Sequence, residues 1–146
     1  MTREEKAVWY YGNGYLCSQS VLAAYAEDYG LTEEQALKLG TCLGAGMRMG
    51  EVCGACTGAL MVLGLVHDDP KNSMAANENT KRFLSAFRDA NGSYLCNDLL
   101  GCDIRTPEGV QYARDNHLFT EFCQKMVASA VDILEEIIQS RSDSDA

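Results

Sequence analysis

The final third of the chain carries a helical period regular enough to constrain the class of fold. Between residues 116 and 139 the apolar side chains recur every three or four positions and form one broad stripe. They are Phe119, Phe122, Cys123, Met126, Val127, Ala130, Val131, Leu134, Ile137 and Ile138. A strand would instead alternate apolar and polar residues, and we find no such alternation in the sequence. We therefore expect an all-α protein.

Further helices are indicated by the residues at their ends. The capping box Thr32-Glu-Glu-Gln35 opens a helix that the glycines from residue 40 onward should end. Asp69-Pro70 predicts the cap and first turn of a helix that stops at Asn91-Gly92. Apolar spacing and turn residues add helices over 16–29, 51–66 and 116–139, a short turn after Ser93 that holds Cys96, and a short helix after Thr106-Pro107.

The length of the chain suits one domain. It has 146 residues, of which 47% are hydrophobic, enough to bury a real core. We expect a single-domain helical bundle of about five to six helices over residues 1–139. The polar tail 140–146 is expected to be disordered.

Charge and hydropathy restrict the partners. The chain has 21 acidic and 12 basic residues, a net charge of −9, with no cluster of Lys and Arg that could follow a phosphate backbone, so nucleic acid is not expected. The longest nearly apolar run, 52–66, is shorter than the roughly 20 residues of a membrane-spanning helix. The N-terminus has no uninterrupted apolar stretch typical of a secretory signal. We expect a cytoplasmic protein with a redox partner that the sequence does not identify, and homodimerisation stays open.

Seven cysteines are many for a cytoplasmic chain. They are Cys17, Cys42, Cys53, Cys56, Cys96, Cys102 and Cys123. Their number is odd, their share is below the ~8–10% of disulfide scaffolds, and the cytosol keeps thiols reduced. Metal binding, thiol chemistry and simple burial therefore compete as explanations, and a disulfide framework comes last.

Cys53 and Cys56 are the most closely spaced pair. At i and i+3 on a helix they face the same way. If that helix begins near Glu51, Cys53 lies in its first turn, where free backbone N–H groups and the helix dipole stabilise a thiolate. A nucleophile and a metal ligand both need the thiolate form. Gly54 and Gly58 predict that another backbone approaches this helix closely, and plain packing is the simpler explanation for them.

The positions of the other cysteines extend this hypothesis. Cys17, Cys53, Cys96 and Cys123 each fall at or near the start of a predicted helix, so the four starts could converge at one end of a bundle. For any one of them, burial as a small hydrophobe explains the residue equally well. A thioredoxin-type site would need a βαβ pattern, and a zinc ribbon would need a second closely spaced pair. Neither is present in the sequence.

The residues resemble a family of small bacterial and archaeal redox-active proteins defined by four cysteines and a Cys-Gly-Ala-x-x-Gly motif. The motif reads Cys-Gly-Ala-Cys-Thr-Gly over 53–58, and the resemblance extends from residue 12 to 137. It assigns the four family cysteines to Cys17, Cys53, Cys96 and Cys123. A related domain stands at the N-terminal side of split-Soret cytochromes, where such cysteines are associated with an iron–sulfur centre, so the resemblance implies a cluster by analogy. Cys42, Cys56 and Cys102 are additions to the family pattern.

Three hypotheses follow. The leading one is a redox protein for electron transfer or redox sensing, with Cys17, Cys53, Cys96 and Cys123 as metal ligands for an iron–sulfur cluster or zinc. The second is a metal-free thiol–disulfide oxidoreductase with Cys53 and Cys56 as catalytic residues, which requires an exposed thiolate of low pKa at Cys53. The third is a helical binding or scaffold module whose cysteines only pack. Whether the protein is an enzyme stays open.

Overall fold

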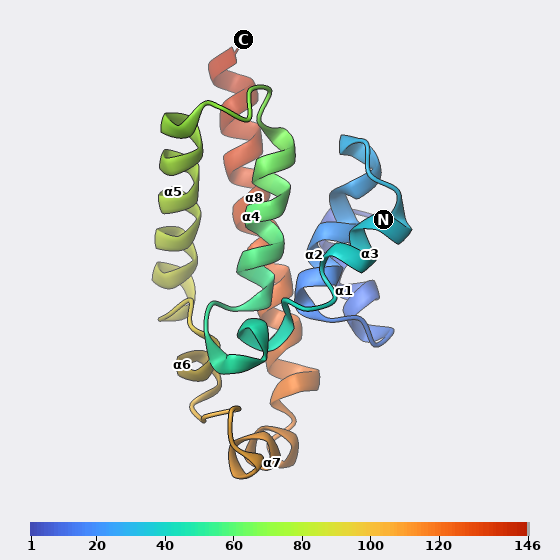
Figure 1. The fold of residues 1–146 in the computed structure, drawn as a ribbon, viewed down its shortest axis with the longest axis vertical. Helices are drawn as coiled ribbons and strands as arrows, with labels where there is room; N and C mark the ends of the chain where they lie inside the picture. The colour runs from blue at the N-terminus through green and yellow to red at the C-terminus, as the bar shows by residue number, and fades with distance from the viewer. Residues whose placement is uncertain (146) are drawn as a thin grey trace.

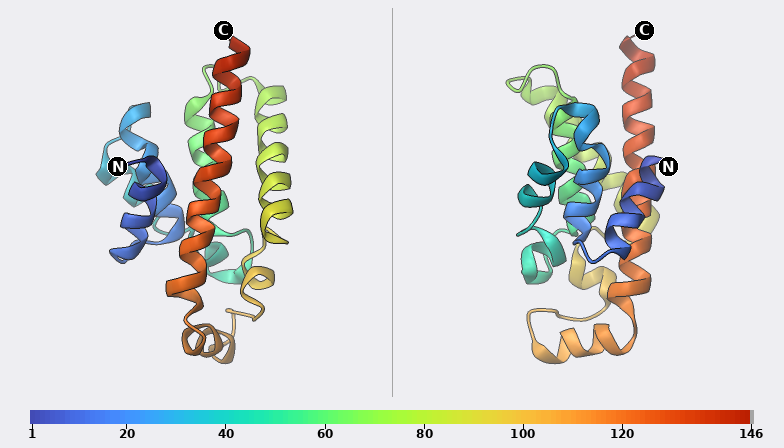
Figure 2. Two further views of the ribbon diagram at one scale, coloured as in Figure 1. Left: turned by 180° about the vertical axis from the view of Figure 1, so that it is seen from behind. Right: turned by 90° about the vertical axis from the view of Figure 1, so that its right-hand side faces the viewer.

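Three long helices run side by side and carry most of the core (Figure 1). In this computed structural model, which describes residues 1–145, they are α4 (Gly54–Val66), α5 (Ser73–Asn91) and α8 (Cys123–Asp145). Beside them lie α1 (Arg3–Gly12), α2 (Cys17–Tyr25) and α3 (Glu33–Leu39), while α6 (Cys96–Leu100) and α7 (Pro107–Asp115) lie at the end away from the C-terminus (Figures 1 and 2). The described residues form no strand, which confirms the all-α prediction, with eight α-helices where five to six were expected.

The apolar stripe of α8 faces the core as predicted. Val127, Val131 and Leu134 on this stripe are fully buried. Phe83 and Phe87 of α5 are buried in the same core. The helix continues to Asp145, beyond the predicted end near residue 139, so it includes most of the segment 140–146 that we expected to be a separate tail. Ala146 of that segment lies outside the described residues.

Two of the three predicted helix caps are confirmed. The hydroxyl of Thr32 accepts from the Gln35 N–H at 3.1 Å, and the Gln35 side chain accepts from the Thr32 N–H at 3.0 Å, which completes the capping box of α3. The hydroxyl of Thr106 accepts from the Gly109 N–H at 3.0 Å and caps α7, with Pro107 in its first turn. Local sequence determines these caps because the partners are only three residues apart.

The predicted start of α5 is wrong. Asn72, three residues beyond Asp69, caps the helix by accepting from the Ala75 N–H at 3.2 Å. Asp69 instead accepts from the Lys71 N–H at 2.9 Å and closes a turn before the helix. Asp and Asn both suit either position, so composition alone did not distinguish a turn from a cap. The predicted end at Asn91-Gly92 is confirmed, with Gly92 left-handed at φ +92°.

The segment before α4 is a left-handed turn. Ala45, Met47 and Arg48 have φ of 54°, 58° and 60°, and Gly46 between them has φ 59°. An L-residue loses roughly 1–2 kcal/mol in this conformation. The turn is tight, because a Cβ on Gly46 would collide with the backbone of Glu51. This segment is therefore a strained, specific turn, and α4 begins at Gly54 rather than near Glu51 as expected.

Helix α2 packs directly on α4, as the two glycines predicted. A Cβ on Gly58 would lie 2.7 Å from the carbonyl oxygen of Ser18, and one on Gly54 would meet the sulfur of Cys17. Ser18 is itself buried, and its hydroxyl donates to the Gly40 carbonyl at 2.7 Å. The small residues on α4 thus bring the first turn of α2 to the start of α4.

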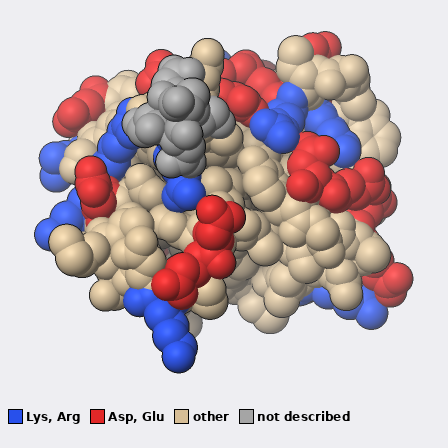
Figure 3. Space-filling model, turned by 90° about the horizontal axis from the view of Figure 1, so that it is seen from above, with Lys and Arg blue, Asp and Glu red and all other residues tan. Residues whose placement is uncertain are grey.

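Charges of both signs are interspersed on the surface seen from above (Figure 3). Among the described helices, none is both long and apolar enough to cross a membrane.

Candidate functional site

Four cysteines occupy the starts of four different helices. Cys17, Cys96 and Cys123 are the first residues of α2, α6 and α8, and Cys53 immediately precedes α4 as its N-cap residue. The starts of α4, α6 and α8 lie toward the same end of the bundle (Figure 1). Cys53 and Cys96 are each 7% exposed, and Cys17 and Cys123 are half-buried.

The thiol of Cys53 lies between two other thiols. It interacts with the Cys17 thiol and with the Cys56 thiol. Cys56 is on the same face of α4, as its i+3 spacing predicted, and it is fully buried. The pair Cys53/Cys56 is therefore joined by Cys17 from α2 rather than standing alone.

Cys96 and Cys123 belong to the same electrostatic group. Burial raises the pKa of Cys96 to about 12, with further contributions from Cys123, Cys17 and Cys102. Burial and the Cys17 thiol raise the pKa of Cys123 to about 11, although the Tyr11 hydroxyl lowers it. Cys17 thus connects the four cysteines, because its thiol affects the pKa of each of the other three, and burial raises the pKa of all four.

The expectation of a low-pKa thiolate at Cys53 is wrong. The Cys17 thiol lowers the pKa of Cys53, but the Cys56 thiol and burial outweigh it, and the net pKa is well above that of an ordinary thiol. The backbone N–H of Ala55 also lowers this pKa, as the start of a helix should. One N–H does not compensate for the loss of water around the sulfur. The buried Cys53 is a neutral thiol at neutral pH.

Backbone N–H groups also reach the sulfur of Cys17. The Cys53 thiol and burial raise the pKa of Cys17 strongly, and the backbone N–H groups of Ala45 and Ser18 act in the opposite direction. Ala45 belongs to the left-handed turn, so the strained backbone is what aims this donor at the site. These donors would stabilise negative charge on the sulfurs once it formed.

Tyr11 is part of the site, although it is not among the site residues expected from the sequence. Its hydroxyl donates to the backbone carbonyl of Phe119 and also interacts with the Cys123 sulfur. Burial and the thiols of Cys123, Cys17 and Cys53 raise the pKa of Tyr11. Aromatic residues at 9–11 were the available indication, but nothing in the sequence related them to a cysteine more than a hundred positions away.

The remaining cysteines differ in their surroundings. Cys42 is exposed in the loop after α3. Cys102 is half-buried, packs with an apolar group that includes Cys96 and Ile104, and contributes to the raised pKa of Cys96. Neither interacts with Cys53 in the way that Cys17 and Cys56 do.

The donor chemistry of the site suits thiophilic metals, since four thiols are available within the protein. As the side chains lie, however, residues 1–145 contain no group of three or more His, Cys, Asp or Glu that could hold a metal ion. The four cysteines therefore do not form a ready-made shell around one ion.

Comparison with known proteins identifies the class of protein. A family model described as "Putative redox-active protein (C_GCAxxG_C_C)" matches residues 15–137, and the chain belongs to this family. The central part of the label, Gly-Cys-Ala-x-x-Gly, differs from residues 53–58 of this chain in the order of its first two letters. No curated protein and no solved structure matches the chain.

Proposed function

We propose that this protein is a redox protein in which Cys17, Cys53, Cys96 and Cys123 together hold an iron–sulfur cluster. The observation that supports it best is that three thiols from three separate helix starts all interact with the Cys17 thiol at a fourth. Packing explains any single buried cysteine. It gives no reason for Cys53, Cys96 and Cys123 all to interact with Cys17, which lowers the pKa of the first and raises the pKa of the other two.

The residues around the thiols fit this proposal. Burial keeps the free thiols neutral, so that only a bound cationic centre would let all four ionise together. The N–H groups of Ala45, Ser18 and Ala55 are already directed at two of the sulfurs, where they would stabilise the charge. When bound, a cluster supplies one-electron transfer, with a potential that depends on such hydrogen bonds and on burial.

A cluster explains the arrangement better than zinc does. The thiolates of a polynuclear cluster are distributed over two or more iron atoms, so they need not all surround one ion as the four ligands of tetrahedral zinc do. The described side chains contain no group that could hold a single ion, so either centre would require the cysteine side chains to move.

The test is the metal and sulfide content per chain, with a visible spectrum, of protein purified without oxygen. We expect iron with a matching amount of sulfide and a broad absorbance near about 400 nm. Zinc in a one-to-one ratio would favour the closed structural site instead. Protein that contains neither metal, even after reconstitution with iron and sulfide, would rule out the cluster.

A second candidate is supported by the position of Cys53 between Cys17 and Cys56. Two neighbouring thiols can pass two electrons and two protons to an oxidised small disulfide, forming one protein disulfide and two small thiols. The raised pKa of Cys53 makes this exchange slow at neutral pH, because only the thiolate attacks a disulfide. Peptide mapping of protein incubated with oxidised glutathione tests it: a Cys53 disulfide is expected, and seven free thiols would exclude it. If the protein contained no metal and formed no disulfide, the remaining hypothesis would be a helical binding or scaffold module whose cysteines only pack.

A further inference from the structure

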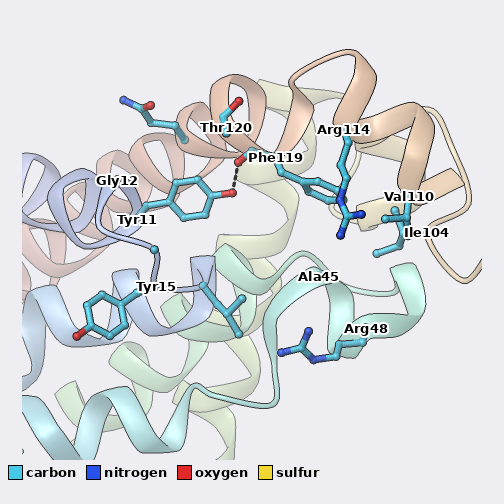
Figure 4. A pocket seen from close by; sticks show the side chains of 13 residues that line it. Tyr11, Gly12, Tyr15, Ala45, Arg48, Ile104, Val110, Arg114, Phe119 and Thr120 are labelled. Atoms are coloured by element: carbon cyan, nitrogen blue, oxygen red, sulfur yellow. Dashed lines mark hydrogen bonds between the residues drawn. The ribbon is translucent and has the colours of Figure 1, made fainter. Parts of the chain in front are cut away.

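A pocket of about 700 Å³ opens among residues of α1, α7 and the left-handed turn (Figure 4). Tyr11, Leu16 and Phe119 line one part of it, and two of these adjoin the thiol site: Tyr11 interacts with Cys123, and Leu16 precedes Cys17. This volume lies within the range of small-molecule sites. The pocket is separate from the sulfurs, because none of the cysteines is among its lining residues.

Two arginines direct their guanidinium groups toward the middle of the pocket. Figure 4 shows Arg114 of α7 entering from one side and Arg48 of the left-handed turn from the other. No acidic residue lines the pocket, in a chain where acidic residues outnumber basic ones by 21 to 12. The positive charge of this pocket is therefore contrary to the charge of the protein as a whole.

Neither arginine is neutralised by the protein. Among the side chains that the structure describes, those of residues 1–141, Arg48 and Arg114 have no ion-pair or side-chain hydrogen-bond partner. The other described arginines all have a side-chain partner: Arg3, Arg82, Arg88, Arg105 and Arg141. Two unpaired guanidinium groups on opposite sides of one hollow are suited to binding an oxyanion.

The backbone conformation of Arg48 supports a role for this residue in binding. Arg48 itself has φ 60°, in a turn where its neighbours Met47 and Ala45 are left-handed as well. Such conformations cost free energy and persist at binding sites where they position a side chain. The remaining walls, with the rings of Tyr11, Tyr15 and Phe119, offer flat apolar surface.

We propose that this pocket binds a small organic anion, with a carboxylate or phosphate group held between Arg48 and Arg114 and a flat apolar body against Tyr11, Tyr15 and Phe119. Binding requires no metal at the cysteines, so this inference stands or falls independently of the proposed cluster. Its position beside Tyr11 places such a ligand next to the thiol site, where it would be suited to be a redox substrate or an effector.

Titration of the full chain with three ligands of one shape tests the proposal. Benzoate and phenyl phosphate carry the two candidate groups, and benzamide is the neutral control. Binding is followed by NMR shifts of the backbone amides of Gly12, Gly14 and Thr120, which line the pocket. We expect saturable shifts with one or both anions and at least about tenfold weaker binding of benzamide. The tighter anion identifies the preferred group.

Arginine variants make the test specific to this site. Arg48→Gln and Arg114→Gln should each weaken anion binding about tenfold or more, whereas Arg88→Gln, on α5, should change it less than about twofold. Equal binding of benzamide, no saturable shift with either anion, or unchanged binding by both pocket variants would overturn the proposal. If Arg48→Gln fails to fold, Arg114→Gln and the benzamide comparison decide it, because Arg114 is exposed on α7.

Discussion

The sulfur of Cys17 occupies the space that a side chain at position 54 would need, so Gly54 allows the first turns of α2 and α4 to meet. The close packing of α2 on α4 buries part of the core and also brings the thiol of Cys17 to that of Cys53. A substitution at Gly54 therefore tests both.

Gly54→Ala should destabilise the protein by about 1–3 kcal/mol, because the added methyl group collides with Cys17 and forces α2 away from α4. Urea unfolding measures this. Gly64→Ala on the same helix is the control: no described residue lies within 4 Å of its Cβ position, so it should stabilise by roughly 0.5–1 kcal/mol. Equal effects of the two substitutions would show that the contact with Cys17 carries no cost.

Serine substitutions separate the proposed ligands from the other cysteines. Cys17→Ser, Cys53→Ser, Cys96→Ser and Cys123→Ser should each lower the iron content per chain severalfold, since an alcohol is a poor ligand for iron–sulfur clusters. Cys42→Ser should leave it unchanged, because Cys42 is exposed and apart from the thiol group. Cys56→Ser decides the role of the extra thiol. If the variant retains iron, the proposed ligand set is supported. If it loses iron, Cys56 is a ligand in place of one of the four proposed cysteines.

Tyr11→Phe should lower the free energy of unfolding by about 1 kcal/mol, because the half-buried carbonyl of Phe119 loses its donor. Thermal or urea unfolding of reduced, metal-free protein measures the change. Tyr112→Phe, whose side chain is 50% exposed, should change it by less than about 0.5 kcal/mol. A neutral Tyr11→Phe variant would mean that water replaces the hydroxyl without cost.

Glu4 gives the fold a pH dependence unrelated to the cysteines. The neighbouring Asp132 and burial raise the pKa of Glu4 from 4.5 to about 7. The folded protein therefore retains a proton that the unfolded chain releases, so this pair favours folding below pH 4.5 and the advantage is lost as the pH rises to about 7. Asp132→Asn should be more stable than the wild type at pH 8, by up to about 1 kcal/mol, with the difference shrinking toward pH 4.5.

Unfolding measured at several pH values checks this expectation. Glu136→Gln, also exposed on α8, removes a charge of the same sign and is the control. Its effect should vary little between pH 5 and 8. A pH-independent effect of Asp132→Asn would contradict the raised pKa of Glu4.

Features determined by neighbouring residues were predictable from the sequence. The stripe of α8, the capping box at Thr32 and the glycines that admit α2 all follow from local spacing, and so does the position of four cysteines at helix starts. The ionisation of Cys53 was not predictable. Its helix start should lower the pKa, but burial by distant segments and the Cys56 thiol determine the result.

Backbone strain and long-range contacts also could not be predicted from the sequence. Ala45 and Arg48 are residues that rarely adopt positive φ, so no local rule predicts a left-handed turn there. The same holds for Tyr11, which meets Cys123 only because α1 packs on α8. In each case the tertiary structure, rather than local preference, determines the geometry of the site.

The order in which the molecule acquires its properties follows from the positions of the four cysteines along the chain. Because Cys17 begins α2 and Cys123 begins α8, no fragment lacking either end of the bundle contains all four thiols. A ribosome must release nearly the whole polypeptide before they can meet, and closing contacts of such long sequence separation is slow. Any cofactor would thus bind late in biogenesis. A chain that contains the cofactor would be one in which the helices had already folded together.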